Sequence, residues 1–131
     1  MRHALMAALV APAIVVGHGA GAAGGPYSSA YLTCVDPSRA VPDTEVRLCI
    51  EEELTRQDDR LNAEHQRQLA NSSPTRRSRL REAHRAWTTF RDANCAVWVD
   101  RTGAEMRLQQ RRCVLEETVR HAEELADIIP E

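Results

Sequence analysis

The sequence predicts an all-α protein: a small antiparallel three-helix bundle, stapled by two disulfides and preceded by an irregular N-terminal arm. Three observations predict it. Apolar residues recur at helical spacing over three long segments, short breaks separate these segments, and no stretch alternates as a strand would. The chain of 131 residues divides into a signal peptide (1–23), an arm (24–42) and a helical domain (43–131).

The first 23 residues have the composition of a secretory signal peptide. Arg2 is the charged start, Leu5 to Val16 form the apolar run, and Ala20 to Ala23 supply a small-residue cleavage zone. The alternative is a membrane anchor, but the run contains Pro12 and is too short to span a bilayer. We therefore expect an exported protein, periplasmic or extracellular, with no membrane anchor in its mature part.

The charge of the mature chain argues against one class of partner. All 17 basic residues are arginine, and removal of Arg2 leaves 16 of them against 19 acidic residues, a net charge near −3. That balance does not suit a nucleic-acid binder and mildly favours a cationic partner.

Residues 24–42 are rich in glycine, proline and serine, which predicts an irregular arm pinned at Cys34. The first long helix is expected after Asp43, where acidic residues suit the helix dipole, and it should end near Asn71-Ser72. Its stripe is thin and has two polar members: Ile50, Leu54, Asp58, Leu61, His65 and Leu69.

The second helix is expected from Pro74 to about Asp100, with Ser73 as its N-cap. It contains the aromatic-rich stretch Ala83–Cys95, where we expect the core to be thickest. One side should carry Leu80, Ala83, Trp87, Phe90, Asn94, Val97 and Trp98.

The third helix is expected from about Ala104 to Ile129, after a turn in which Gly103 is available as a left-handed C-cap. Its apolar face is wide enough to touch two neighbours. The predicted core residues are Leu61, Trp87, Phe90 and Leu125.

Four cysteines in a small exported domain predict two disulfides. Local loop closure favours Cys34–Cys49 together with Cys95–Cys113. The start of the first helix lies at the same end of the bundle, so Cys49 could also reach Cys95 or Cys113. A zinc site would need closer ligand pairs than these, since the nearest cysteines are 15 residues apart.

Two polar features of the predicted helices invite a site. His65, His84 and His121 fall at similar heights, one on each helix, so they form either a metal site or three ordinary half-buried residues on separate faces. Asp58 lies level with Arg120 and should either pair with it or turn to solvent, while Glu116 and Glu124 compete for the same arginine.

Arginines crowd the first turns of the second helix, where positive charge opposes the helix dipole: Arg76, Arg77, Arg79 and Arg81. They are either a basic tip for an acidic partner surface or a solvated patch balanced by Glu123, Glu124, Asp127 and Glu131 at the same end of the bundle. No catalytic motif, cofactor-binding motif or metal-ligand motif accompanies them, so we expect no enzyme activity and no cofactor.

One pattern resembles a known family, the LprI-type lysozyme-inhibitor N-terminal domain, over about residues 34–129. The pattern is Cys34, Cys49, Asp58-x-x-Leu61-Asn62, Ala83-x-x-Ala86-Trp87-x-x-Phe90-Arg91-Asp92-x-x-Cys95, Cys113 and Thr118-x-Arg120. His65 and His84 depart from it, since the family pattern usually has tyrosine and glutamine at these positions.

The resemblance implies an exported helical protein whose partner is a cationic lysozyme with an acidic cleft. Inhibition would be stoichiometric occlusion of that cleft, with Arg76, Arg77, Arg79 and Arg81 as the contact suggested by charge. The alternatives are an envelope structural or interaction module without lysozyme inhibition, and a metal-binding periplasmic protein that uses the histidines.

Overall fold

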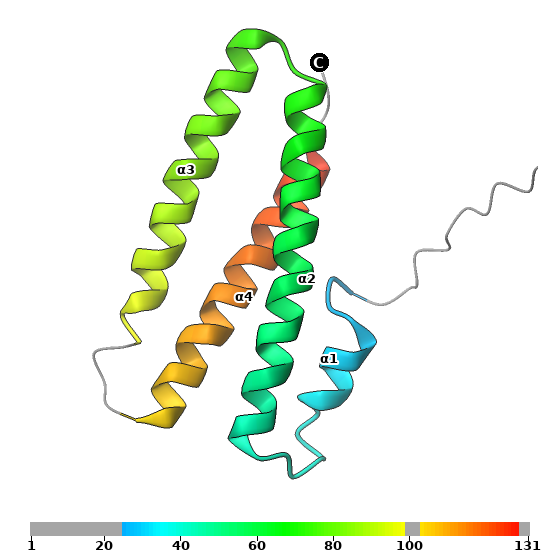
Figure 1. Cartoon of the computed structure of the whole chain (residues 1–131), viewed down its shortest axis with the longest axis vertical. Helices are drawn as coiled ribbons and strands as arrows, with labels where there is room; N and C mark the ends of the chain where they lie inside the picture. Colours follow the sequence, from blue (N-terminus) through cyan, green and yellow to red (C-terminus); the bar gives the residue numbers. More distant parts are fainter. Residues whose placement is uncertain (1–24, 99–102, 129–131) are drawn as a thin grey trace, which may run out of the picture.

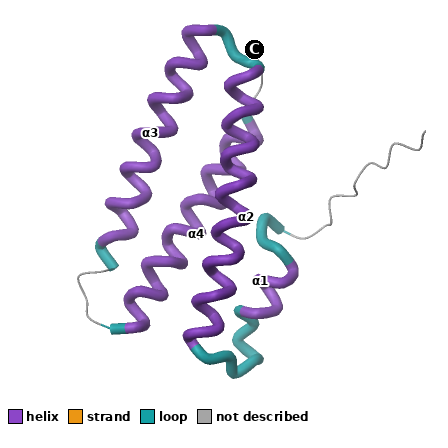
Figure 2. The backbone as a smooth tube through the Cα atoms, in the orientation of Figure 1, coloured by secondary structure: helices purple, strands orange, loops and turns teal. Residues whose placement is uncertain are grey.

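The computed structural model describes residues 25–98 and 103–128. These residues form four helices and no strand: α1 (Ser29–Cys34), α2 (Asp43–Ala70), α3 (Pro74–Ala96) and α4 (Ala104–Asp127) (Figures 1 and 2). None of the described helices is long and apolar enough to cross a bilayer. The predicted signal peptide, Arg101, Thr102 and the last three residues lie outside the described part of the chain.

Local sequence explains where the long helices begin. The Ser73 hydroxyl accepts a hydrogen bond from the Arg76 backbone N–H, and Pro74 occupies the first turn of α3, as predicted. At the start of α2, the N-cap is Pro42, and Asp43 lies inside the first turn, where its charge suits the dipole. Gly103 caps the N-terminus of α4 with φ 144°, so its predicted role as a C-cap is wrong.

The N-terminal arm is more ordered than predicted, because it contains α1. Tyr31 is buried against α2 and packs beside Tyr27, with ring centroids 5.3 Å apart. The composition of the arm did not predict this helix, because only two tyrosines and a leucine supply large apolar side chains there. The arm therefore adds to the core instead of trailing from it.

The core lies mainly between α2 and α4, which run close together along the molecule (Figure 1). Ile50, Leu115 and Ala122 have no exposed surface, and Leu61 and Leu125 are 3% and 4% exposed. Leu61 and Leu125 are therefore core residues, as expected from the sequence. These side chains are aliphatic, and the burial of their apolar surface stabilises the fold.

Helix α3 packs far less closely than predicted. Cys95 is its only buried residue among those described, and in Figures 1 and 2 the helix stands off from the α2/α4 pair over most of its length. Phe90 is 56% exposed and Val97 64% exposed, so the expectation that Phe90 belongs to the core is wrong. Trp87 is half-buried against the cluster of Leu61 and Leu125.

The two disulfides explain how α3 is turned. Cys34 is bonded to Cys49 and Cys95 to Cys113, the pairing favoured by loop closure. Because Cys95 must face α4, the residues one, two and three turns before it, Arg91, Trp87 and His84, face inward as well. The inward face is thus rotated from the predicted stripe, in which Leu80 and Trp87 are half-buried and the other members are exposed: Ala83, Phe90, Asn94, Val97 and Trp98.

Candidate functional site

A stack of four rings connects the three long helices near the middle of α3. His65 of α2 lies on His84 of α3, with centroids 4.2 Å apart, and His121 of α4 lies on Trp87 of α3, at 4.1 Å. His84 is also within 5.7 Å of Trp87 and 5.9 Å of His121. We call His65, His84, His121 and Trp87 the histidine stack.

The stack answers the question that the sequence left open about the histidines. They do not lie on separate faces; they meet between the helices. Their rings are nearly parallel, with interplanar angles of 16–28°, whereas metal ligands must point nitrogen lone pairs at one centre. In the described part of the chain, no group of three histidine, cysteine or acidic side chains is arranged to hold a metal ion.

Arg91 sits beside the stack and joins it to α2 and α4. Its guanidinium lies 5.1 Å from the Trp87 ring centroid, and Nη1 donates to Thr118 Oγ1 at 3.2 Å. It also lies 3.8 Å from a carboxylate oxygen of Asp58 and pairs with Asp92 at 2.9 Å. With 16% of its side chain exposed, Arg91 contacts both α2 and α4 from the middle of α3.

Of the two alternatives for Asp58, the pair with Arg120 is wrong: Asp58 lies beside Arg91, and 46% of its side chain is exposed. Arg120 is paired with Glu117, one turn back on its own helix. Burial raises the pKa of Asp58; Arg91 opposes that shift, and the charges of Asp59 and Asp92 add to it. Arg91 was not among the partners expected for Asp58 from the sequence.

The arginines at the start of α3 have different roles. Arg77 is structural, since its guanidinium donates to the carbonyls of Leu69 (3.0 Å) and Ser72 (3.1 Å) and caps the end of α2. Arg67 does the same for α4 through the Ala126 carbonyl at 3.2 Å. Arg79 and Arg81 are exposed, and Arg76 is partly exposed. Glu124, which the sequence offered as a balancing charge, contacts His121.

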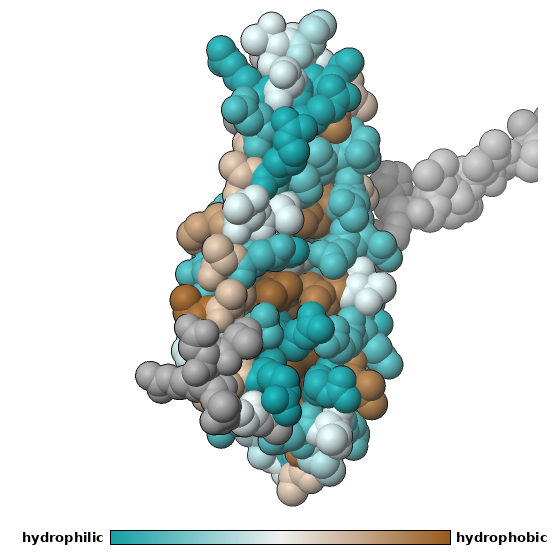
Figure 3. Space-filling model, turned by 60° about the vertical axis from the view of Figure 1, so that its left-hand side comes forward, coloured by the Kyte–Doolittle hydropathy of each residue, from teal (hydrophilic) through white to brown (hydrophobic). Residues whose placement is uncertain are grey.

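The exposed side of α3 is partly apolar. Five residues at helical spacing line it, and we call them the outer face of α3: Ala83, Ala86, Phe90, Ala93 and Val97. In Figure 3, which brings this side of the molecule forward, hydrophobic patches lie near mid-height and the end with the α2–α3 turn is hydrophilic. A basic end thus adjoins an apolar stripe on one accessible helix.

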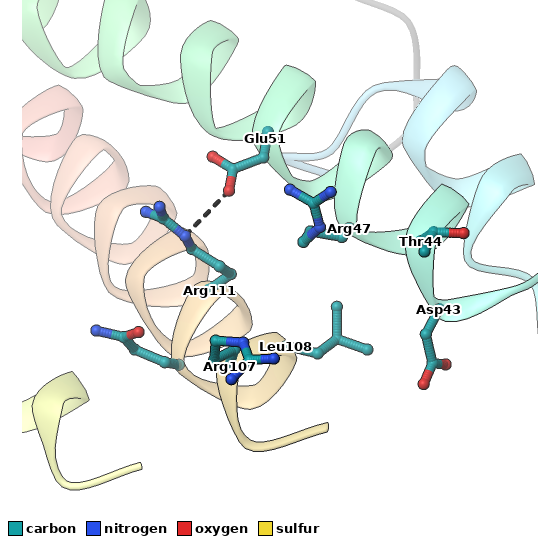
Figure 4. A pocket seen from close by; sticks show the side chains of 8 residues that line it. Asp43, Thr44, Arg47, Glu51, Arg107, Leu108 and Arg111 are labelled. Atoms are coloured by element: carbon teal, nitrogen blue, oxygen red, sulfur yellow. Dashed lines mark ion pairs between the residues drawn. The ribbon is translucent and has the colours of Figure 1, made fainter. Parts of the chain in front are cut away.

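A second surface feature is a cleft between the first turns of α2 and α4 (Figure 4). Arg111 reaches across from α4 to Glu51 of α2 at 3.0 Å, and Arg47 and Arg107 also line the cleft. These side chains are largely exposed and carry both signs of charge. The Glu51–Arg111 ion pair closes the cleft across α2 and α4, and such an exposed pair adds little to stability.

Sequence reasoning missed Glu53, which is fully buried. Its carboxylate accepts hydrogen bonds from the Ser28 backbone N–H, the Ser28 hydroxyl, Gln57 and Arg56. Burial raises the pKa of Glu53, but these donors outweigh it and leave the pKa below its ordinary value. The sequence did carry a signal for it, because the helical spacing of Ile50, Glu53 and Gln57 puts Glu53 on the buried side of α2.

One comparison with known proteins identifies the family of this chain. The family model for the lysozyme inhibitor LprI matches residues 34–125, which include all four cysteines and the whole histidine stack. The chain therefore belongs to the LprI lysozyme inhibitor family. Searches among curated proteins and among solved structures gave no significant match.

Proposed function

We propose that this protein is an exported inhibitor that binds a lysozyme and covers its catalytic cleft without reacting chemically. The observation that carries the proposal is membership of the LprI family over most of the helical domain. Two disulfides in so small a domain support a location in an oxidising compartment, the periplasm or the extracellular space.

The contact surface that we propose runs along α3 from its basic end to Phe90. Lysozyme chemistry uses paired carboxylates, so its cleft offers an acidic target for arginine. Arg76, Arg79 and Arg81 supply the charge, and Phe90 supplies an apolar anchor beside them. Arginine and aromatic side chains are the residues that most often dominate binding energy at protein interfaces. Arg77, already engaged with two carbonyls, keeps the turn in shape.

Turnover of cell-wall substrate by a lysozyme, measured with rising amounts of the purified mature chain, tests the proposal. We expect inhibition that saturates near one-to-one stoichiometry. Arg79→Glu combined with Phe90→Ser should weaken it at least tenfold. Arg107→Glu, an exposed change in the cleft at the other end of the molecule, is the matched control and should inhibit normally.

A folded chain that leaves lysozyme fully active at large molar excess would contradict the proposal. The protein would then be an envelope interaction module of another kind. If inhibition persists in the Arg79→Glu, Phe90→Ser variant and is lost in Arg107→Glu, the function stands and the surface is the cleft of Figure 4.

A further inference from the structure

Each imidazole of the histidine stack carries one buried nitrogen without a hydrogen-bond partner: Nε2 of His65, Nδ1 of His84 and Nε2 of His121. A neutral imidazole tolerates this, because one of its two nitrogens needs no proton. A protonated imidazole must place a hydrogen on both. The stack as built therefore accommodates neutral rings and has no acceptor ready for an additional proton on these nitrogens.

The arginine charges near His65 and His84 also oppose protonation of these two rings. From α3, the charge of Arg81 acts on His65 and that of Arg91 on His84, and Arg91 lies over Trp87. From α2, Asp58 is directed toward Arg91. From α4, Glu124 contacts His121 Nδ1 at 3.2 Å, and in the described residues it is the only carboxylate in contact with a ring of the stack. His65 and His84, face to face at 4.2 Å, would repel each other once both were charged.

The pKa directions agree with this geometry. Burial lowers the pKa of His65; a hydrogen bond to the Leu80 backbone opposes the shift, and His121 and Arg81 add to it. Burial also lowers the pKa of His84, with His65, His121 and Arg91 adding to the effect. The unfolded or detached rings, with ordinary pKa values of 6.5, bind protons first as the pH falls. The attached state is thus fully stable above that pH and loses stability as the pH drops through the lowered values.

The stack matters because little else holds α3. Cys95 near its C-terminal end is its only buried residue in the described part of the chain, and it is tied to Cys113. The Arg77 caps hold the other end. Between these ends, α3 is held to α2 and α4 by the stack, by the contacts of Arg91 and by the hydrogen bond between His65 and the Leu80 backbone, so separation of the rings would weaken the hold on the middle of the helix.

We propose that the histidine stack is an acid-sensitive latch: protonation of His65 and His84 separates the middle of α3 from the α2/α4 pair, while the Cys95–Cys113 bridge keeps the helix attached. The latch is a property of the rings and their neighbours, and it holds whether or not the partner is a lysozyme. It would make any surface carried by α3 dependent on pH.

The test uses the mature chain with Trp98→Phe, which leaves Trp87 as the only tryptophan. Trp87 fluorescence and hydrogen exchange, corrected for the intrinsic effect of pH, are followed from pH 7.5 to 5. We expect a transition centred below the ordinary histidine pKa, with helix content unchanged. Protection of α3 amides should fall at least tenfold between pH 7.5 and 5, while α2 and α4 stay protected.

Two variants make the result specific. The double variant His65→Phe, His84→Phe keeps an aromatic ring at both positions but removes the two titrating imidazoles, so the transition should vanish. If the double variant does not fold, His84→Phe alone should reduce the amplitude of the transition. Asp58→Asn, which removes the other titrating group on α2 beside Arg91, should retain it. The latch is refuted by an unchanged transition in either histidine variant, by its loss in Asp58→Asn, by its absence in the parent, or by α2 and α4 opening together with α3.

Discussion

The α2/α4 pair and α3 are helices of similar length, yet they are held by different forces. Between α2 and α4, side chains such as Ile50, Leu115 and Ala122 are fully buried and aliphatic. On α3, a disulfide, an arginine and a stack of rings make the contacts, and the apolar outer face stays in solvent. The aromatic residues of α3 therefore mark an attachment and an exposed surface, whereas the core between α2 and α4 is mainly aliphatic.

The largest loss of stability is expected from a cavity between α2 and α4. Leu115→Ala removes a side chain with no exposed surface, and we expect a loss of about 2–5 kcal/mol in the free energy of unfolding. Urea denaturation followed by circular dichroism measures it. A loss below about 1 kcal/mol would mean that the α2/α4 interface is not the main core.

Removal of the Cys95–Cys113 disulfide should make α3 detach at a lower urea concentration than the α2/α4 pair unfolds. Cys95→Ala with Cys113→Ala opens a loop of 18 residues, worth about 3 kcal/mol in the chain-entropy model. We expect Trp87 fluorescence, measured with Trp98→Phe, to change at lower urea than helix content does. The matched control, Cys34→Ala with Cys49→Ala, opens a loop of 15 residues and should keep the two probes together. Coincident transitions in the first variant would show that α3 does not depend on this bridge.

A smaller, pH-dependent effect is expected at Glu53. Because its folded pKa lies below the ordinary 4.5, the carboxylate stabilises the fold above that pH and loses this effect as the pH falls through the folded pKa. Glu53→Gln should cost about 1–3 kcal/mol at pH 7, and the difference from the parent should shrink in acid. Thermal melts at pH 7 and pH 3 test this; a constant difference would contradict the charged, hydrogen-bonded state.

The smallest effect is expected on the outer face of α3. Phe90→Ala should change the free energy of unfolding by less than about 1 kcal/mol, since the ring is already 56% exposed. The same denaturation assay serves here. A loss comparable to that of Leu115→Ala would place Phe90 in the core after all.

The sequence predicted the parts that depend on local signals. The three long helices, the Ser73 cap and the cysteine pairing follow from periodicity, capping chemistry and loop length, and all are found in the structure. The short α1 was missed, because a buried glutamate and one tyrosine hold it, and neither is a periodic signal.

The rotation of α3 was also missed, for a reason of geometry. The predicted inward face was Leu80, Ala83, Trp87, Phe90, Asn94, Val97 and Trp98. Trp87 does lie inward, but the bridge of Cys95 to Cys113 and the contacts of Arg91 leave Ala83, Phe90 and Val97 exposed. The sequence predicted three histidines at one height along the helices. The orientation of α3 then brings His84 into contact with His65. Hydrophobic periodicity predicted that α3 is a helix, but its orientation depends on tertiary contacts that periodicity does not predict.

Native-state hydrogen exchange at pH 7.5 tests the central contrast most directly. If α3 is a latched helix on a tightly packed pair, the amides in the middle of α3 should exchange through a local opening, with protection at least a hundredfold below that of the middle of α2 and α4. Equal protection in all three helices, lost together in a single global unfolding, would contradict the account.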